Sequence, residues 1–174
     1  MSAYNYIYEW TNSFNNLPVN LIGVRDSENK WYQTNFNDTL YELEKALFDL
    51  KTKFLLCLGG STGGFAALAF GKALTADKIV AFCPQSVCGK AKRNLGDMRW
   101  PEICQSTPSF DISGTYPKAE IHYSTRDSLD TMHAKRFVPG EFHPWPEGGH
   151  DLPHFLKLYG HLRPILEKAL ASSK

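Results

Sequence analysis

Short apolar runs alternate with longer amphipathic segments along this chain of 174 residues. Four of the runs have the length of a buried strand and are bounded by polar or turn-forming residues. They cover residues 54–58, 78–83, 119–124 and 141–145. Helical patterns at 62–74 and 128–137 lie between them. Strands that alternate with helices predict a mainly parallel sheet with helices on both faces, so we expect the α/β class.

Further elements are expected on either side of these runs. Thr39 and Glu42 have the spacing of a capping box, which predicts that a helix starts at Thr39. That helix places four leucines on one face, where we expect them in the core: Leu40, Leu43, Leu47 and Leu50. An earlier strand is expected at Val19–Val24, and Gly160 and Pro164 should divide the C-terminal region into two helices. Aromatic residues alternate near the start, as in an edge strand or a packed arm: Tyr4, Tyr6, Tyr8 and Trp10.

The most informative stretch is FLLCLGGSTGGFAA, residues 54–67. It holds Gly59, Ser61 and Gly63 in the pattern G-x-S-x-G, between a predicted strand and a predicted helix. In that context the serine lies at the tip of a sharp turn, with its hydroxyl exposed and helix N–H groups behind it. A phosphate-binding turn or a purely structural turn is the alternative. The two glycine-rich phosphate motifs do not fit, because Ser61 and Ala66 stand where glycine is required.

A nucleophilic serine of this kind needs an acid and a histidine later in the chain. Asp127 follows the predicted strand 119–124, where the orienting acid belongs in such a sheet. His150 follows two glycines in a loop after the last predicted strand, whereas the other histidines lie in strand or helix patterns. The chain order is thus Ser61, Asp127, His150.

Each choice leaves an alternative open. Asp130 is the second candidate for the acid, and Asp127 would then only cap the helix that follows. By spacing alone, Asp130 with His133 or His150 with His154 could ligate a metal. No zinc-ligand pattern such as H-E-x-x-H or C-x-x-C supports this, so no metal is expected.

With these residues the chain resembles the α/β-hydrolase superfamily. The likeness rests on GGSTGGFAALAFG, on Asp127 at a strand end and on the Gly148-Gly149-His150 loop. More narrowly, LIGVRDSENKWYQ, the serine turn and IVAFCPQS are similar to small hydrolase-like proteins associated with bacterial surface-polysaccharide loci. The resemblance covers most of residues 18–170 and implies a trimmed α/β-hydrolase fold. It also implies Ser61 as nucleophile, His150 as base and Asp127 as the orienting acid, without a cofactor.

An acyl-transfer site also needs hydrogen-bond donors for the developing oxyanion. The backbone N–H of Thr62 is the first expected donor. The superfamily places a second donor in the loop after an early strand, often with an HGGG-like sequence. Here that loop reads Arg25-Asp26-Ser27 and has no glycine run. We expect the second donor at Arg25 or Asp26, in a site of reduced efficiency.

The composition restricts the compartment and the partners. Lys and Arg total 19 and Asp and Glu total 18, so the net charge of +1 implies no single-sign field for nucleic acid or anionic membrane. The apolar runs are far shorter than the roughly 18 residues of a membrane span, and no secretory signal pattern is present at the start. Four scattered cysteines give no disulfide framework, which favours a cytoplasmic protein. The length predicts one domain over residues 1–174.

Residues 85–117 have no clear periodicity and lie between two predicted strands. The superfamily often inserts a lid at this point, and a long ordered loop is often functional. We expect either a lid or a solvated surface insertion. A lid would bring Trp100 to the substrate, with Gly60 of the serine turn as a second substrate contact.

These features predict a serine hydrolase that works through an acyl-enzyme, and the resemblance implies that it is an esterase or thioesterase. The expected substrate is a small acylated molecule, for which a saccharide-linked acyl group is one candidate. Two alternatives stay open: a catalytically weak hydrolase-fold binding protein, and an acyltransferase that acts on a saccharide. Hydrolysis and transfer use the same residues, because exclusion of water decides between them.

Overall fold

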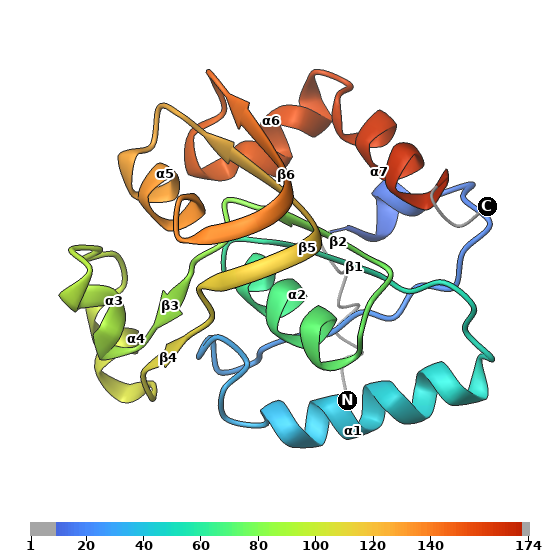
Figure 1. The fold of residues 1–174 in the computed structure, drawn as a ribbon, viewed down its shortest axis with the longest axis horizontal. Helices are drawn as coiled ribbons and strands as arrows, with labels where there is room; N and C mark the ends of the chain where they lie inside the picture. The colour runs from blue at the N-terminus through green and yellow to red at the C-terminus, as the bar shows by residue number, and fades with distance from the viewer. Residues whose placement is uncertain (1–9, 172–174) are drawn as a thin grey trace, which may run out of the picture.

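The computed structural model describes residues 10–171. Its main sheet has four strands in the order β1-β2-β5-β6, and every neighbouring pair is parallel (Figure 1). The strands are β1 (Leu56–Gly60), β2 (Lys78–Phe82), β5 (Gly114–Ser124) and β6 (Phe137–Trp145). Each corresponds to one of the four apolar runs, so the predicted α/β class with a mainly parallel sheet is confirmed.

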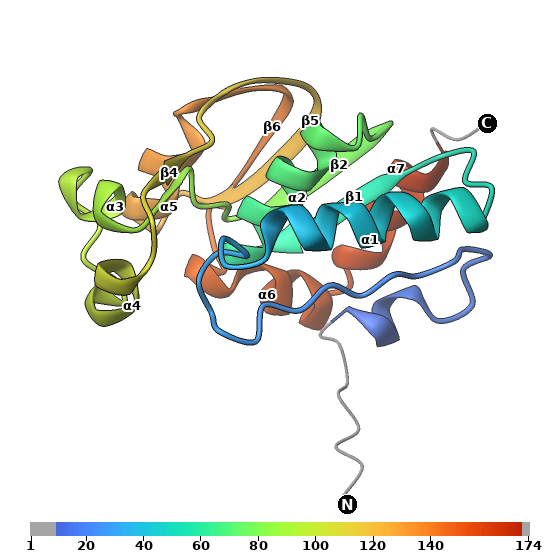
Figure 2. The same ribbon diagram turned by 90° about the horizontal axis from the view of Figure 1, so that it is seen from below.

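Helices cover both faces of this sheet, as the two perpendicular views show (Figures 1 and 2). One face carries α1 (Phe36–Asp49) and α2 (Thr62–Ala73). The other face carries α6 (Leu152–Leu158) and α7 (Leu162–Ala171). Shorter elements complete the chain: η1 (Thr11–Phe14), α5 (Ser128–Ala134) and η2 (Gly149–Asp151). Within residues 10–171, no helix combines the length and the apolar character needed to cross a bilayer.

The alternation of side chains along β2 explains why the protein has two cores. Ile79 and Ala81 face α2 and belong to the core on that side. Val80 and Phe82 face the opposite way and belong to the core formed with α6 and α7. An uninterrupted apolar run is expected for a parallel strand that is buried on both faces.

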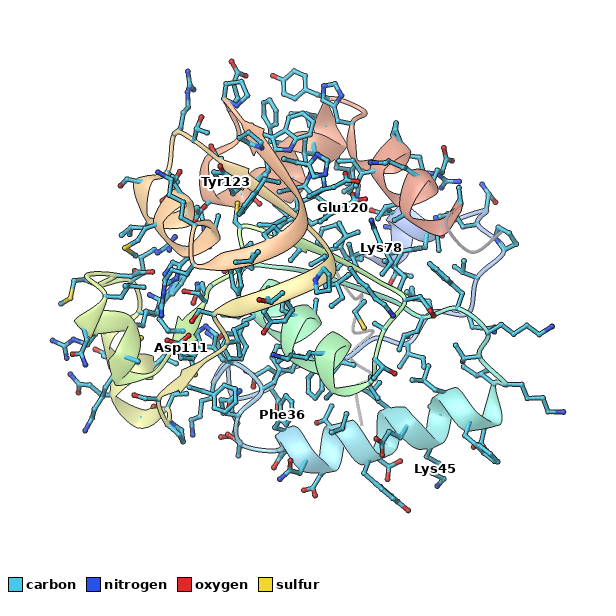
Figure 3. All side chains as sticks on the ribbon, in the orientation of Figure 1. Phe36, Lys45, Lys78, Asp111, Glu120 and Tyr123 are labelled. Atoms are coloured by element: carbon cyan, nitrogen blue, oxygen red, sulfur yellow. The ribbon has the colours of Figure 1, made fainter. Side chains whose placement is uncertain are left out.

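The first long helix differs from its prediction. α1 begins at Phe36 after Asn35, so Thr39 lies inside the helix and the predicted capping box is wrong. Phe36, labelled in Figure 3, stacks on Phe70 of α2 with 4.4 Å between ring centroids, which anchors the first turn. The leucine face is also less buried than expected. Three of its residues are half-buried and the last is exposed: Leu40, Leu43, Leu47 and Leu50.

The predicted strand at Val19–Val24 is wrong, because these residues join no β-ladder. β1 is therefore an edge strand of the sheet. A cavity of about 1260 Å³ is lined by the segment that contains Val19–Val24 and by β1, α1 and α2. Trp10 stacks on Phe82 with 5.6 Å between centroids. The other alternating aromatic residues, Tyr4, Tyr6 and Tyr8, lie outside the described residues.

Residues 85–117 are more regular than expected. β3 (Val87–Cys88) and β4 (Phe110–Asp111) form an antiparallel ribbon, and α3 (Lys90–Asn94) and α4 (Pro101–Ser106) lie between its strands. In both views these four elements project together from one end of the sheet (Figures 1 and 2). Because β3 follows β2, this lobe is attached at the carboxyl end of the parallel strands.

Two helices do form at the C-terminus, as predicted. Gly160, with φ of 75°, lies between α6 and α7. Pro164 lies within the first turn of α7, where its fixed φ and missing N–H cost nothing, and does not break the helix.

Candidate active site

The G-x-S-x-G segment forms the expected sharp turn between β1 and α2. Ser61 has φ of 52° and ψ of −116°, a conformation that residues with a side chain rarely adopt. A Cβ at Gly59 would lie 2.1 Å from the carbonyl oxygen of Gly63, so only glycine fits at Gly59. The N–H of Ser61 donates to the carbonyl oxygen of Phe82 over 2.9 Å, which holds the turn at the carboxyl end of β2.

Ser61, His150 and Asp130 form one hydrogen-bonded chain across this end of the sheet. Ser61 Oγ lies 2.8 Å from Nε2 of His150, and Nδ1 of His150 lies 2.7 Å and 3.0 Å from the two carboxylate oxygens of Asp130. An ionised carboxylate only accepts, so Nδ1 carries the ring proton and donates it to Asp130. Nε2 is then left to accept from the serine hydroxyl. In this arrangement the imidazole can take the serine proton while the oxygen attacks a carbonyl carbon.

Asp127, the acid expected from the sequence, does not contact His150. Its Oδ1 accepts from the N–H groups of Leu129 and Asp130, so Asp127 caps the N-terminus of α5. Asp130 lies in the first turn of that helix and is the carboxylate that meets the imidazole. The expectation of Asp127 is therefore corrected to the alternative, Asp130. Asp127 serves as the capping residue of α5, and Asp130, three residues further along, is the one that contacts His150.

Asp130 is suited to remain ionised although it is buried. Its side chain is 1% exposed. Burial alone would raise the pKa of Asp130, but hydrogen bonds and charges from His150 and Arg99 lower it below the ordinary value. The carboxylate can therefore hold the imidazole proton and stabilise an imidazolium.

The loop that carries His150 is tied to the end of β5. The hydroxyl oxygen of Ser124 accepts the N–H of Gly149 over 3.1 Å, and the N–H of Thr125 donates to the carbonyl oxygen of Trp145 over 2.8 Å. Gly148 and Gly149 have φ of 90° and 56°, which explains the two glycines before the histidine. Sequence reasoning missed Ser124, which looks like any strand residue in the pattern.

Arg99 from the lobe reaches the same histidine. Its Nη1 lies 3.0 Å from Nδ1 of His150 and 3.0 Å from Oδ1 of Asp130. Its Nε and Nη2 donate to the two carboxylate oxygens of Asp97. A guanidinium therefore lies beside the ring nitrogen that donates to Asp130. Nothing in the aperiodic residues 85–117 marks Arg99, so the sequence analysis did not single it out.

A buried ionic cluster fixes Arg99 in place. Lys92 Nζ donates over 2.8 Å to Asp97, and neither side chain is exposed. Ser86 donates its N–H to Nδ1 of His133, so the proton of that ring is on Nε2, 3.1 Å from Asp97. Burial opposes ionisation of Asp97, but these donors together with Arg99 hold its pKa well below the usual range. The lobe is thus docked through a fully partnered carboxylate in addition to its apolar contacts, since Cys88 and Cys104 belong to the core that contains Phe65.

A small cavity of about 140 Å³ opens at the serine. Its walls come from the loop before α1, the serine turn and α4: Asn29, Trp31, Ser61, Thr62, Trp100 and Ile103. Trp100, expected to meet the substrate, is thus one of its walls and lies tilted against His150 with 5.8 Å between centroids. Gly60, the second expected contact, lines the larger cavity instead.

Thr62, the first expected oxyanion donor, lines both cavities and is the first residue of α2, so its N–H has no acceptor within the helix. Arg25 and Asp26 line the larger cavity and not the small one. Both carboxylate oxygens of Asp26 accept backbone N–H groups, from Glu28 and Tyr32, so this side chain shapes its own loop. The second donor at Arg25 or Asp26 stays a prediction.

Gln85 is a further neighbour of the nucleophile that the sequence analysis did not single out. Its side chain is fully buried, with Nε2 3.3 Å from Ser61 Oγ and Oε1 2.6 Å from the indole Nε1 of Trp31. Gln85 is the third residue after β2, at the same end of the sheet as Ser61, His150 and Asp130. The position of Gln85 shortly after a predicted strand was the one signal in the sequence that could have placed it near Ser61.

Two groups of side chains have metal-ligand types within 4.8 Å of one another among the described residues. The first is Cys83 with Asp130 and His150. Burial raises the pKa of the Cys83 thiol, with further help from the charge of Asp130, and Arg99 already neutralises that carboxylate. A thiol that keeps its proton is a poor ligand, so this group fits the proton chemistry of His150 better than a metal.

The second group is Glu120, His122 and His143. The two imidazole rings stack at 11° with centroids 4.3 Å apart, so their ring nitrogens cannot both point in-plane at one ion. The indole N–H of Trp145 donates to Nδ1 of His122, which puts the ring proton on Nε2. Glu120 is also paired with Lys78, beside which it lies in Figure 3. The geometry is that of a buried ionic and aromatic cluster and does not suit a metal.

Neither the protein-family models nor the curated proteins match this chain.

Proposed function

We propose that this protein is a serine hydrolase with a trimmed α/β-hydrolase fold, which cleaves a small ester or thioester through an acyl-enzyme. The observation that carries the proposal is the hydrogen-bonded chain from Ser61 Oγ through His150 to Asp130. The strained serine turn at the carboxyl end of a parallel sheet supports it.

The proposed reaction begins when Ser61 Oγ attacks the acyl carbon and His150 Nε2 takes its proton. Asp130 holds the resulting imidazolium, and the Thr62 N–H donates to the oxyanion. His150 then returns the proton to the leaving oxygen or sulfur, which departs and leaves the acyl group on Ser61. A water molecule, deprotonated by His150, then attacks the acyl carbon. The bond from that carbon to Ser61 Oγ breaks, His150 returns the proton to Oγ, and the acid is released.

The size of the small cavity suggests the acyl group. A volume of about 140 Å³ corresponds to about four or five water-sized groups at roughly 30 Å³ each. Three apolar side chains, Trp31, Trp100 and Ile103, line it together with three polar residues, Asn29, Ser61 and Thr62. We therefore expect a short acyl chain, with the rest of the substrate outside the cavity.

A second candidate is a hydrolase-fold protein that binds an acyl ligand with little turnover. Its support is Arg99, whose Nη1 lies 3.0 Å from His150 Nδ1. If Arg99 donates to that nitrogen, the ring proton moves to Nε2 and the imidazole cannot accept from Ser61.

The test is labelling with a fluorophosphonate probe near neutral pH, followed by hydrolysis of p-nitrophenyl acetate. We expect the wild-type protein to be labelled and to release p-nitrophenol, and Ser61→Ala to do neither. A folded wild-type protein without labelling or turnover would support the binding protein instead. Because an acyl-enzyme can react with water or with another hydroxyl, product analysis with added sugars separates hydrolysis from transfer.

A further inference from the structure

The site as described has one backbone donor for an oxyanion, the N–H of Thr62. Acyl-transfer sites pair such a donor with a second one, and removal of one donor typically costs a hundredfold or more in rate, on the order of 10²–10³. The loop that the sequence favoured for the second donor lines the larger cavity, which Thr62 also lines, and not the small cavity at Ser61. Another group near Ser61 should therefore be sought for this role.

Gln85 presents an amide to the nucleophile in a fixed orientation. Indole Nε1–H is a donor only, so the Gln85 atom 2.6 Å from Trp31 Nε1 is the carbonyl oxygen. The amide nitrogen is then the atom that lies 3.3 Å from Ser61 Oγ. Trp31 is 1% exposed and Gln85 is fully buried, so neither side chain can turn away into solvent. Trp31 thus removes the usual ambiguity of a glutamine amide.

We propose that the Gln85 Nε2–H group is the second oxyanion donor of the proposed hydrolase; the inference rests on that proposed function. As the Oγ–C bond forms, the carbonyl π electrons move onto the oxygen, and the serine proton passes to His150 Nε2. The new O⁻ is bonded to the same carbon as Oγ, so it develops beside the atom that Gln85 already contacts. Gln85 donates a hydrogen bond there and transfers no proton.

Gln85 lies beside Ser61 at the same end of the sheet, although it is not among the residues that line the small cavity. Gln85 follows β2, while Thr62 begins α2, and the Ser61 N–H is bonded to Phe82 at the end of β2. The two donors therefore approach Ser61 from two neighbouring elements that are held together by the turn itself. A preorganised amide in a buried setting pays no reorganisation energy when the charge appears.

The experiment compares wild type, Gln85→Met and Trp31→Phe in hydrolysis of p-nitrophenyl acetate and in the rate of fluorophosphonate labelling. Methionine keeps the approximate volume of glutamine without the donor. We expect Gln85→Met to lower kcat by about 10²-fold with KM changed by less than about threefold, and to slow labelling by a similar factor. Trp31→Phe keeps an aromatic ring but frees the amide, and should lower kcat by about tenfold. Urea unfolding of both variants checks that they are folded.

Four outcomes decide the matter. A loss of kcat in both variants, with KM retained, supports the donor role. If the wild-type protein is active and folded Gln85→Met has a kcat within about threefold of the wild-type value, the role of Gln85 is overturned. The proposed function is then left standing. If Gln85→Met does not fold, Trp31→Phe with wild-type kcat overturns the role in the same way. A wild-type protein that is neither labelled nor active overturns both.

Discussion

Nη1 of Arg99 lies 3.0 Å from Nδ1 of His150, the ring nitrogen that also lies 2.7 Å from Asp130. The guanidinium and the carboxylate therefore meet at one atom. The carboxylate stabilises a proton on Nδ1, and the guanidinium opposes a positive charge on the ring. Asp97 holds the guanidinium from the other side, so this arrangement depends on the docked lobe.

The first prediction separates the two acids at the start of α5. Asp130→Asn should lower kcat by about 10⁴-fold, because the amide no longer fixes the correct imidazole tautomer. Asp127→Asn is the matched control, since asparagine also caps helices, and its kcat should stay within about threefold of wild type. Ester hydrolysis by both variants measures this. A large loss in Asp127→Asn with normal Asp130→Asn activity would restore Asp127 as the acid.

The second prediction concerns Arg99. Arg99→Gln removes a hydrogen bond that helps to lower the pKa of Asp130, so this carboxylate should take up a proton more readily as the pH falls. The acidic limb of the profile of kcat/KM against pH should therefore move to higher pH. Arg99→Lys should shift it less, because the charge is kept. An unmoved limb in Arg99→Gln would mean that the guanidinium only positions the lobe.

The third prediction tests the acyl cavity. Ile103→Ala enlarges the cavity at the serine and should raise kcat/KM for hexanoate relative to acetate esters by about tenfold. Glu102→Ala, exposed on the same helix, is the control and should leave the ratio unchanged. Competition between p-nitrophenyl esters of increasing chain length gives the ratio directly. Equal ratios in both variants would place the acyl group elsewhere.

The fourth prediction concerns the cluster around Glu120. Contact with His122 lowers the pKa of Glu120 to about 2 from 4.5, against the effect of burial and with help from Lys78 and Lys168. A lowered folded-state pKa stabilises the protein above pH 4.5, and this contribution is lost as the pH falls toward 2. Glu120→Gln should therefore be less stable at pH 7 and show a shallower loss of stability between pH 4.5 and pH 2.

Urea unfolding at several pH values measures this fourth effect. Glu120→Gln removes one group that binds a proton differently in the folded and unfolded states. This changes the slope of the unfolding free energy against pH by at most about 1.4 kcal/mol per pH unit. Glu44→Gln, on the exposed side of α1, is the control and should follow the wild-type curve. A wild-type slope in Glu120→Gln would mean that other carboxylates carry the acid sensitivity.

The fifth prediction tests how the lobe is held. Asp97→Asn leaves the buried ammonium of Lys92 without its counter-charge, and breaking such a pair costs about 3–5 kcal/mol. Proteolysis within residues 85–117 should become faster before the rest of the chain unfolds. If Asp97→Asn unfolds at the same urea concentration as the wild type and shows no new cleavage, the ionic cluster does not secure the lobe.

The sequence predicted those parts of the fold that depend on local pattern. The four parallel strands and α2 follow from apolar runs and from the glycines of the serine turn. Val19–Val24 has strand-forming residues, but a strand also requires a partner, and pairing is decided by packing of distant segments. The capping box at Thr39 was overridden because Phe36 gains a stacking contact with Phe70.

The site was predictable to the same extent. Ser61 and His150 are marked by glycines that their backbone conformations require. Asp127 and Asp130 differ in sequence only by their position relative to the start of one helix. To choose between them one must know in which direction each side chain leaves the helix, and the sequence does not give this. Arg99 and Gln85 act through contacts with residues far away in sequence, and such contacts leave no local pattern.

Ser61 and His150, the proposed nucleophile and base, are separated by 89 positions in the chain. Ser61 thus gains its proton acceptor only after the strands and the lobe between the two residues have formed and His150 has reached the same edge of the sheet. A partly synthesised or partly unfolded chain would carry an ordinary, unreactive serine. Reactivity at Ser61 should accordingly appear last during refolding. The rate at which a covalent serine probe labels the chain would therefore measure how fast the native state is completed.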